Sequence, residues 1–185
     1  VGFLDAQVAE TASGGAVCVY HRGRPVVDAW SGVADRAGTP WQSDSLAVSC
    51  STTKGVTSTA LHVCVDRNLV DYDDRVADHW PEFAQQGKER ITVRQLLAHQ
   101  AGLYVLDEPL DRGLVADLDR LAVVLARQKP AWEPGTRQAY HGITLGFYES
   151  ELLRRVDPGR RSLSQFFQDE IASPLGLDVY IRLPE

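Results

Sequence analysis

The chain has 185 residues, of which 44% are hydrophobic and 24% are charged, and its formal net charge is −6. This length and composition are typical of a globular protein that can bury a core of its own. The acidic balance argues against nucleic acid or an anionic membrane as the main partner, and no apolar stretch is long enough to span a bilayer.

The first part of the chain contains the predicted strands. Apolar residues within 1–13 indicate part of a helix, which the pair Gly14-Gly15 ends. Residues 16–20 are typical of a buried strand and residues 26–30 of a second one, with a Gly- and Pro-containing turn between them. The pattern therefore predicts an antiparallel hairpin over residues 16–30.

The rest of the chain is predicted to be mostly helical. Residues 69–83 contain no regular pattern, and residues 84–90 are polar and indicate a loop. Thr92 is expected to be the N-cap of its helix, and Asn68 the C-terminal cap of the first helix in this part. Apolar spacing predicts helices over residues 51–67, 91–99, 114–127, 143–156 and 162–171.

Ser51 and Lys54 lie at the start of the first of these helices. If the helix begins at or just before Ser51, an amine three residues later lies about one turn away, on the same face. A serine hydroxyl is a weak nucleophile unless a neighbouring base takes its proton, and an amine of lowered pKa can be that base. The helix N-terminus also favours developing negative charge.

The Ser-x-x-Lys pattern is common, and in an arbitrary sequence it usually marks a solvated lysine on an ordinary helix. Here the chain has only three lysines, and Lys54 alone has a serine three positions before it. A nucleophile elbow of the form G-x-S-x-G is absent, which argues against an α/β-hydrolase.

Further motifs follow Ser51-Thr-Thr-Lys54 in a fixed order. They are Leu69-Val-Asp-Tyr-Asp-Asp, Ile91-Thr-Val-Arg-Gln-Leu-Leu-Ala-His99, Trp132-x-Pro-Gly-Thr, Tyr140 and Pro174-Leu-Gly-Leu177. In this order the motifs resemble the serine β-lactamase/penicillin-binding-protein superfamily over nearly the whole chain. Within it, the chain is most similar to class C β-lactamase-like proteins and family VIII carboxylesterases.

The resemblance implies an α+β fold: an antiparallel sheet flanked by helices, with an all-helical region inserted after the Ser51 helix. It assigns residues 1–75 to the sheet domain and residues 76–185 to the mostly helical region. It implies that Ser51 is the acylated nucleophile, that Lys54 activates it, and that Tyr140 acts with Lys54 as general base. The backbone N–H of Ser51 would be one oxyanion donor, and no metal or other cofactor is implied.

Two departures from the family pattern carry information. The asparagine expected two positions after the tyrosine is Gly142 here, which favours an esterase over a β-lactamase. No lysine is followed by Thr-Gly or Ser-Gly, so the third motif is absent from these 185 residues. We therefore expect this chain to be the N-terminal part of a catalytic unit that associates with a C-terminal part carrying the returning strands.

Several other residues have two interpretations. His141, Tyr104 and Trp132 are candidate substrate contacts, although a structural histidine and core aromatics are the alternatives. His99 is expected to brace a helix end, and Cys50 to be a small packed residue. The chain has three cysteines without metal-ligand spacing, which indicates free thiols and weakly favours a cytoplasmic location.

The sequence thus predicts a serine hydrolase that acts by acyl-enzyme chemistry on small esters, as a carboxylesterase does. The alternatives within enzymes are a β-lactamase, a D-peptidase or an acyltransferase. The alternative outside enzymes is a non-catalytic fragment without the third motif, whose unpaired sheet edges would serve in binding.

Overall fold

A computed structural model of the chain describes residues 2–11 and 13–181. The chain divides into two compact units, Val1–Val48 and Ser49–Glu185. The division into residues 1–75 and 76–185 rests on the family's architecture and stays a prediction. Val1 and residue 12, both within the segment 1–13 that was predicted to contain part of a helix, lie outside the described residues.

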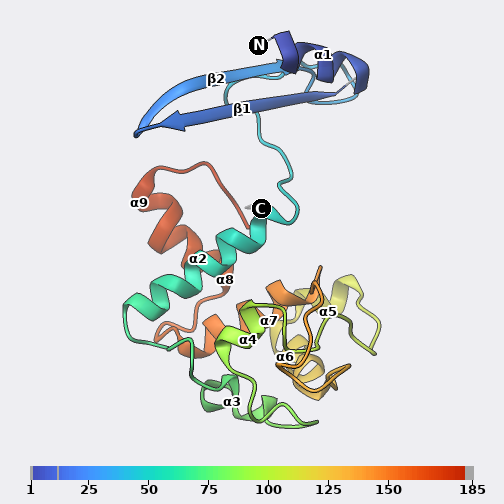
Figure 1. The fold of residues 1–185 in the computed structure, drawn as a ribbon, viewed down its shortest axis with the longest axis vertical. Coiled ribbons are helices and arrows are strands. Elements are labelled where there is room, and N and C mark those ends of the chain that lie inside the picture. Colours follow the sequence, from blue (N-terminus) through green and yellow to red (C-terminus); the bar gives the residue numbers. More distant parts are fainter. Residues whose placement is uncertain (1, 12, 182–185) are drawn as a thin grey trace. The chain divides into compact units, whose positions relative to one another are not determined.

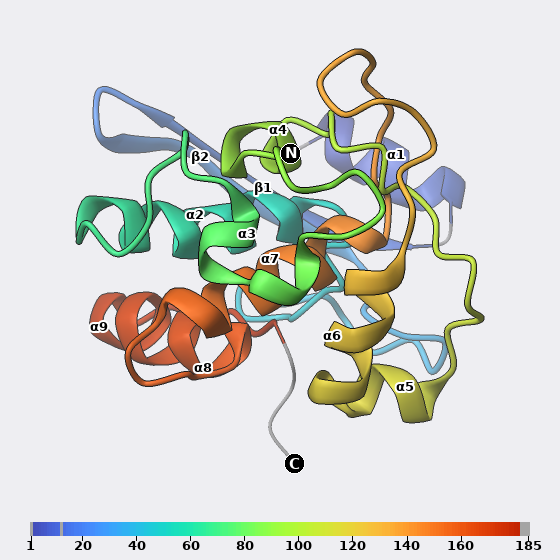
Figure 2. The same cartoon turned by 90° about the horizontal axis from the view of Figure 1, so that it is seen from below.

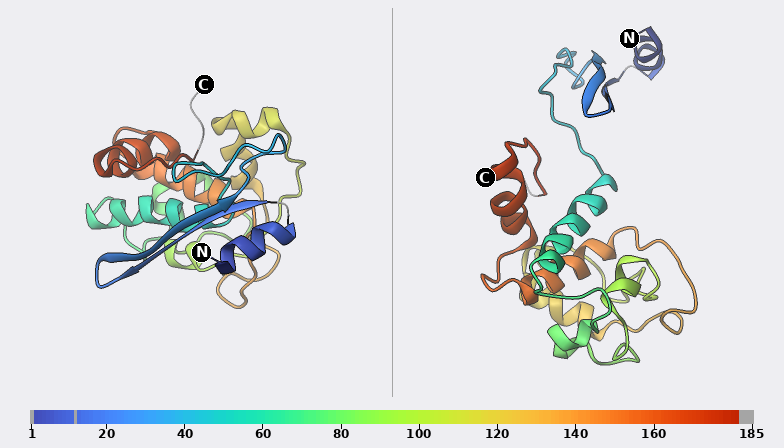
Figure 3. Two further views of the ribbon diagram at one scale, coloured as in Figure 1. Left: turned by 90° about the horizontal axis from the view of Figure 1, so that it is seen from above. Right: turned by 60° about the vertical axis from the view of Figure 1, so that its left-hand side comes forward.

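The first unit contains helix α1 (Gly2–Thr11) and strands β1 (Gly14–His21) and β2 (Arg24–Gly32). The strands pair antiparallel, as predicted, and form the long blue hairpin of Figure 3. Arg22 and Gly23 form its two-residue turn, and both have a positive φ, 50° and 74°. Such a turn matches the right-handed twist of paired strands.

The expectation of a buried strand over residues 16–20 is wrong. None of the side chains of β1 is buried, and Ala29 is the buried residue of β2. The reason is that the described part of the sheet has two strands, so within this unit only α1 packs against them. Val17, Val19 and Trp30 are therefore exposed apolar side chains.

The second unit begins with helix α2 (Thr52–Asp66), whose buried face includes Ala60, Leu61 and Cys64. The C-cap residue is Arg67, one position before the predicted cap Asn68. Asn68 follows it with φ 56° and donates its N–H to the carbonyl of Val65, so it is the left-handed residue just after the cap. Helix α2 packs against α7 (Thr144–Val156) of the same unit. Both helices are labelled in Figure 1, where α2 is teal.

Short helices and turns complete this unit around α7. Helix α7 packs against α2, α3, α4, α6 and α8, and Figure 2 shows it in the middle of these helices. The remaining bounds are α3 (Val76–His79), η1 (Pro81–Phe83), α4 (Val93–Leu97), α5 (Arg112–Ala116), α6 (Leu118–Arg127), α8 (Leu163–Phe167), η2 (Gln168–Ala172) and α9 (Ser173–Leu175). Of the helices described, none is long and apolar enough to cross a membrane.

Side-chain caps explain where these helices begin. Thr92 accepts a hydrogen bond from the N–H of Gln95, and the Gln95 side chain accepts from the N–H of Thr92, which confirms the predicted N-cap. The predicted helix over 114–127 is instead two helices. Asp117 has an extended backbone and accepts from the N–H of Arg120, so it ends α5 and caps α6.

Two other segments differ from prediction. Residues 76–83, expected to be irregular, form α3 and η1. The predicted helix over 162–171 begins as α8, capped by Ser162, and continues as the π-turn η2. The π-turn contains Glu170, whose side chain belongs to an ion-pair cluster described below.

An aromatic cluster lies in the core of the second unit. The rings of Trp80, Phe83 and Tyr148 have centroids 5.2 to 6.4 Å apart, and all three side chains are fully buried. Tyr148 lies on α7 and donates its hydroxyl hydrogen to the carbonyl of Leu125 on α6. Burying each such side chain contributes roughly 2 kcal/mol to stability, so the cluster is a main part of the hydrophobic core of this unit.

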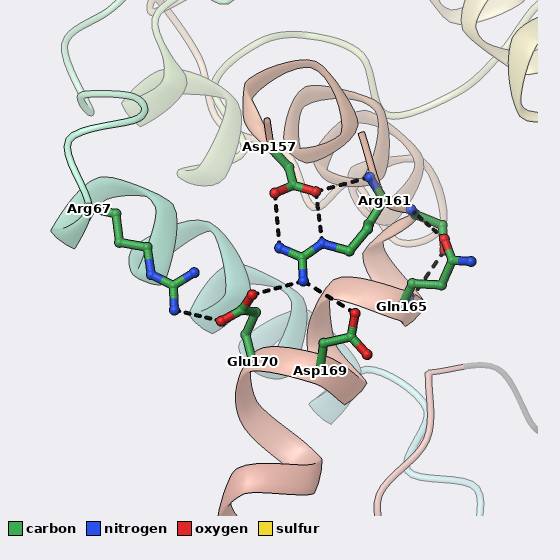
Figure 4. Close-up of polar contacts among 7 residues, drawn as sticks. Arg67, Asp157, Arg161, Gln165, Asp169 and Glu170 are labelled. Carbon is green, nitrogen blue, oxygen red and sulfur yellow. Dashed lines mark hydrogen bonds and ion pairs between the residues drawn. The ribbon is translucent and has the colours of Figure 1, made fainter. Parts of the chain in front are cut away.

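A cluster of ion pairs joins the end of α2 to the segment after α7 (Figure 4). Arg161 donates two hydrogen bonds to the buried carboxylate of Asp157, and it also donates to Glu170 and Asp169. Glu170 accepts in turn from Arg67, the C-cap residue of α2. The cluster therefore fixes the C-terminal helices against α2.

Candidate active site

Ser51 and Lys54 lie at the N-terminal end of α2, as the sequence predicts. Ser51 is the residue just before the helix, and the Lys54 N–H donates to the Ser51 carbonyl. The Lys54 ammonium donates to Oγ of Ser51 at 3.2 Å and to the carbonyl oxygen of Gly142 at 2.6 Å. The amine is therefore held beside the hydroxyl by a third group, a backbone carbonyl from the loop before α7.

Cys50 precedes the candidate nucleophile and has φ 47°, in the left-handed region that residues other than glycine rarely adopt. Such conformations are costly and cluster at functional sites. The expectation that Cys50 is packed is wrong, because its side chain is exposed. Its carbonyl accepts a hydrogen bond from the N–H of Thr53, in the first turn of α2.

Tyr140 lies in the same loop as Gly142 and faces the start of α2. Its side chain is 57% exposed, and the Lys54 ammonium lies 4.8 Å from its ring centroid. Hydrogen bonding with the Ser51 hydroxyl, and then with Lys54, lowers the pKa of the phenol from its ordinary value. The structure thus brings the three predicted side chains together, although 86 residues separate Lys54 from Tyr140.

Two histidines support the loop that carries Tyr140. Nδ1 of His141 donates to the carbonyl of Ala139 at 2.7 Å, and its Nε2 accepts from the N–H of Leu103 at 2.9 Å. The N–H of His141 donates to Nδ1 of His99, so the His99 side chain braces this loop, whereas it was expected to brace a helix end. Burial lowers the pKa of both imidazoles, so both rings are favoured in the neutral form.

These contacts bear on the predicted substrate contact of His141. The ring is fully buried, and both of its nitrogens have partners within the chain. The structure gives it the bracing role that was the alternative interpretation. A contact with substrate would require the ring to leave both partners.

Tyr104 and Trp132 form a stacked pair, with ring centroids 5.5 Å apart and planes at 17°. Tyr104 is 40% exposed and follows Leu103, the residue that is bound to His141. The Nε1 atom of Trp132 is buried and has no hydrogen-bond partner among the described residues. The pair therefore presents aromatic surface from two connections, the one between α4 and α5 and the one between α6 and α7, which also carries Tyr140.

Glu149 on α7 was not singled out from the sequence. Its side chain is fully buried and accepts hydrogen bonds from the hydroxyls of Thr57 and Ser58 on α2. Burial raises the pKa of this carboxyl, against the opposite effects of Ser58, Thr57 and the Lys54 charge. One feature of the sequence could have indicated that Glu149 is buried. The residue lies on the same face of the predicted helix as the apolar Leu145 and Leu152, which are buried in the structure.

A separate pocket of about 340 Å³ lies between α2, α6, α7 and the start of α8. Its walls include Thr53, Thr57, Leu121, Leu125, Phe147 and Leu163. Neither Ser51, Lys54 nor Tyr140 is among the residues that line it. The pocket is therefore distinct from the Ser51 site. Within residues 2–11 and 13–181, no group of three or more potential ligands could hold a metal ion.

Comparison with known proteins shows the family of the chain. The family model described as Beta-lactamase matches residues 3–182. The chain is 43% identical over 169 residues to "Esterase/beta-lactamase LipL" of Mycobacterium tuberculosis, a match that covers 89% of this chain and 38% of that protein.

Solved structures give the same result. A family VIII carboxylesterase is 41% identical, with a TM-score of 0.89 over 99% of this chain and 51% of its own. A penicillin-binding protein homolog from Caulobacter crescentus is 36% identical, with a TM-score of 0.87 over the same shares. These matches confirm the predicted fold class and resemblance. The chain spans about half the length of these two solved chains.

Proposed function

The chain belongs to the beta-lactamase family, and from this premise we propose that its protein is a serine hydrolase that forms an acyl-enzyme on Ser51 and acts on small carboxylic esters. The observation that carries the proposal is the meeting of three groups. The Lys54 ammonium lies 3.2 Å from the Ser51 hydroxyl, and both lower the pKa of the Tyr140 phenol. A hydroxyl, a fixed positive charge and a base of lowered pKa are what serine acylation requires.

In the proposed acylation, the Tyr140 phenolate takes the proton of the Ser51 hydroxyl while Oγ attacks the carbonyl carbon of the ester. The Lys54 charge favours the phenolate form. The oxyanion that develops lies near the N-terminus of α2, where the N–H of Ser51 has no acceptor among the described residues. The ester C–O bond then breaks, and the alcohol leaves with the proton that Tyr140 returns.

Water completes the cycle in the second half of the proposed reaction. The same phenolate takes a proton from water, the hydroxide oxygen attacks the acyl carbon, and the bond to Oγ of Ser51 breaks. Tyr140 returns the proton to Oγ, so the enzyme regains its starting state. The three groups therefore serve both half-reactions without any cofactor.

The ester preference has two supports. At the position where the family's β-lactamases have asparagine, this chain has Gly142, whose carbonyl contacts Lys54 and which offers no side-chain amide. Two of the relatives are also named for esterase activity. We assign the Tyr104–Trp132 pair as one wall of the acyl site, because stacked aromatic rings offer an apolar surface.

The test uses the full-length protein and a fluorophosphonate probe, which reacts with activated serines. We expect an intact-mass adduct on Ser51 that Ser51→Ala lacks, together with hydrolysis of p-nitrophenyl acetate and butyrate. Turnover of nitrocefin without ester hydrolysis would assign a β-lactamase instead. Transfer of the acyl group to an added alcohol or amine in preference to water would assign an acyltransferase.

The absence of any adduct would instead support the non-catalytic alternative. Release of D-alanine from a D-alanyl-D-alanine peptide without ester turnover would assign a D-peptidase. We also propose a cytoplasmic location and association of this chain with the remaining part of the catalytic unit. Fractionation of cells, and co-purification of the two parts expressed separately, test these two points.

A further inference from the structure

The buried ring of His141 connects two parts of the candidate site. Its Nδ1 lies 2.7 Å from the carbonyl oxygen of Ala139, the residue just before Tyr140. Its Nε2 lies 2.9 Å from the backbone nitrogen of Leu103, the residue just before Tyr104. One nitrogen therefore binds the loop of the proposed base, and the other binds the turn that carries the proposed acyl-site wall.

The two partners of the ring require one protonation state. A carbonyl oxygen only accepts and a backbone N–H only donates, so Nδ1 of His141 must carry the hydrogen and Nε2 must be the acceptor. This is one neutral tautomer, and a cation would direct a second hydrogen at the N–H of Leu103. Burial lowers the pKa of His141, against a smaller opposite effect of its bond to Ala139, so the neutral form is favoured.

On the Nδ1 side, two further hydrogen bonds hold the same loop. The N–H of Ala139 donates to the carbonyl of His99 at 3.2 Å, and the N–H of His141 donates to Nδ1 of His99 at 3.0 Å. The His99 ring lies against that of Tyr140, with centroids 5.0 Å apart. Because the Tyr140 side chain is 57% exposed, the position of its phenol depends on how firmly the residues on either side of it are held.

On the Nε2 side, both backbone groups of Leu103 are bound by residues near the start of α7. Its N–H donates to His141, and its carbonyl accepts from the hydroxyl of Thr144 at 2.6 Å. Tyr104 follows directly and stacks on Trp132. The aromatic pair is therefore fixed relative to the loop before α7 through the backbone of one fully buried leucine.

We propose that His141 is a positioning residue for the proposed reaction: through Nδ1 it holds Tyr140 near Ser51, and through Nε2 it holds the wall of the acyl site formed by Tyr104 and Trp132. The inference rests on the proposed function, in which Tyr140 is the base and the aromatic pair contacts the acyl chain. The ring itself touches no reacting atom. It affects both the rate of acylation and the choice of acyl chain, because it is bound to both segments.

Two variants separate the two nitrogens. The amide of His141→Asn takes about the place of Nδ1, so it can donate to Ala139 but does not reach Leu103. The longer amide of His141→Gln takes about the place of Nε2, so its oxygen can accept from Leu103 while the Ala139 carbonyl loses its donor. Each variant leaves one buried backbone group without its partner, so both should unfold at a lower temperature than the wild type.

His141→Gln should affect the base. In the full-length protein we expect fluorophosphonate labelling of Ser51 at pH 7 to slow by about tenfold, because a base that is no longer held in place is misaligned. We also expect the acidic limb of labelling, measured from pH 5 to 10, to move to higher pH. Hydrogen bonding with Ser51 and then with Lys54 lowers the pKa of Tyr140, and a phenol that moves away from them titrates nearer to its ordinary value. The third group that faces this phenol is the ring of His99.

His141→Asn should affect the choice of acyl chain. The ratio of kcat/KM for p-nitrophenyl butyrate to that for p-nitrophenyl acetate should fall by about threefold to tenfold, since an aromatic wall that is no longer fixed makes poorer contact with the longer chain. The acidic limb of labelling should stay where it is in the wild type, because the contact with Ala139 is kept.

Asp157→Asn is the control for a loss of stability alone. Asp157 is buried and pairs with Arg161, but it lies at the opposite end of α7 from the Tyr140 loop. We expect this variant to unfold at a lower temperature, with the acidic limb and the ester ratio of the wild type. A shift of either readout in a His141 variant that Asp157→Asn lacks supports the positioning role.

The outcomes separate the role of His141 from the proposed function. If the wild type is labelled at Ser51 and both His141 variants keep its acidic limb and its ester ratio, the positioning role is excluded while the proposed function stands. The role of each nitrogen stands or fails with its own variant. If neither variant folds, Thr144→Val, which removes the other contact with Leu103, decides, and an unchanged ester ratio there excludes the role. If the wild type is neither labelled nor active on either ester, the proposed function fails, and the role of His141 fails with it.

Discussion

Nζ of Lys54 lies 2.6 Å from the carbonyl oxygen of Gly142, a residue 88 positions later in the chain. The same ammonium lies 3.2 Å from Oγ of Ser51. One side chain therefore joins the start of α2 to the loop that carries Tyr140. The position of the base relative to the nucleophile depends on this contact as well as on the helix.

Replacement of Lys54 should abolish most of the reactivity of Ser51. Lys54→Met removes both the charge that favours the Tyr140 phenolate and the contact with Gly142, so we expect fluorophosphonate labelling of Ser51 to slow by about 10³-fold. Lys54→Arg retains the charge but not the compact ammonium geometry, and should retain part of the rate. The rates are measured by intact mass in the full-length protein.

Thermal unfolding provides the control for this pair. The Lys54 hydrogen bonds to Ser51 and Gly142 are solvent-exposed, so neither variant should lose much stability. A Lys54→Met protein that folds normally and labels at the wild-type rate would contradict the assigned role.

Tyr140→Phe removes the phenol hydroxyl and keeps the aromatic ring, so it tests the hydroxyl alone. Because the side chain is 57% exposed, its loss of the hydroxyl should not affect folding, while labelling should slow by about 10²- to 10⁴-fold if the phenolate is the base. The sign of the pH dependence follows from the lowered pKa. In the wild type the reactive form appears as pH rises through the Tyr140 pKa, at a pH below that of an ordinary tyrosine.

The residual labelling of Tyr140→Phe should lack this acidic limb. Its rate is measured over the same pH range as the wild-type rate. If the acidic limb is unchanged in Tyr140→Phe, it reports the titration of another group. His99, whose ring lies against that of Tyr140, is then the next candidate.

Part of the site could be predicted because its chemistry is local in sequence. The spacing of Ser51 and Lys54 places both on one helical turn, whatever the rest of the fold does. Thr92 followed by Gln95 is a capping box that needs no tertiary contact. Tyr140 could be located only through the family resemblance, since 86 residues separate it from Lys54.

The parts that were missed depend on tertiary contacts or on backbone atoms. The carbonyl of Gly142 has no sequence signature as a lysine acceptor. The apolar period of residues 114–127 continues through Asp117, so the break between α5 and α6 is visible only in the cap that Asp117 forms. The apolar strand β1 was expected to be buried, but none of its side chains is. The pattern of apolar residues predicts a strand, but it does not show which other element covers the strand.

Asp157→Asn should destabilise the fold by about 2 kcal/mol, because it removes one partner of a buried ion pair with Arg161. Hydrogen bonding from Arg161 lowers the pKa of Asp157. A depressed pKa in the folded state gives stability that is present above the unfolded pKa and is lost as pH falls through the folded pKa. The difference between wild type and variant in urea unfolding should therefore narrow as pH falls below about 4.

Asp73→Asn is the matched control for this ion pair. Asp73 also binds an arginine through two hydrogen bonds, from Arg94, but both side chains are largely exposed. Exposed pairs contribute little to stability, so this variant should unfold as the wild type does. Equal effects of the two variants would show that burial of Asp157 is not what gives its ion pair strength.

Lys88→Met tests a buried lysine that has no role in the proposed reaction. The fully buried ammonium donates to the carbonyls of Gln85, Ala126 and Gln128, and so closes the loop of residues 84–90 onto the end of α6. Methionine fills similar volume but leaves three buried acceptors without a donor, which should cost about 2 kcal/mol at pH 7.

The pH dependence distinguishes this lysine from an exposed one. Burial lowers the pKa of Lys88 from 10.5 to about 8, so between these values the unfolded chain binds more protons than the folded chain. Stability should therefore rise with pH over that window in the wild type, and Lys88→Met should lose the rise. Lys129→Met, at an exposed position, should leave both the stability and its slope unchanged. Parallel curves for the wild type and Lys88→Met in urea unfolding at pH 7 and pH 9.5 would show that the three carbonyl contacts keep the ammonium charged despite its burial.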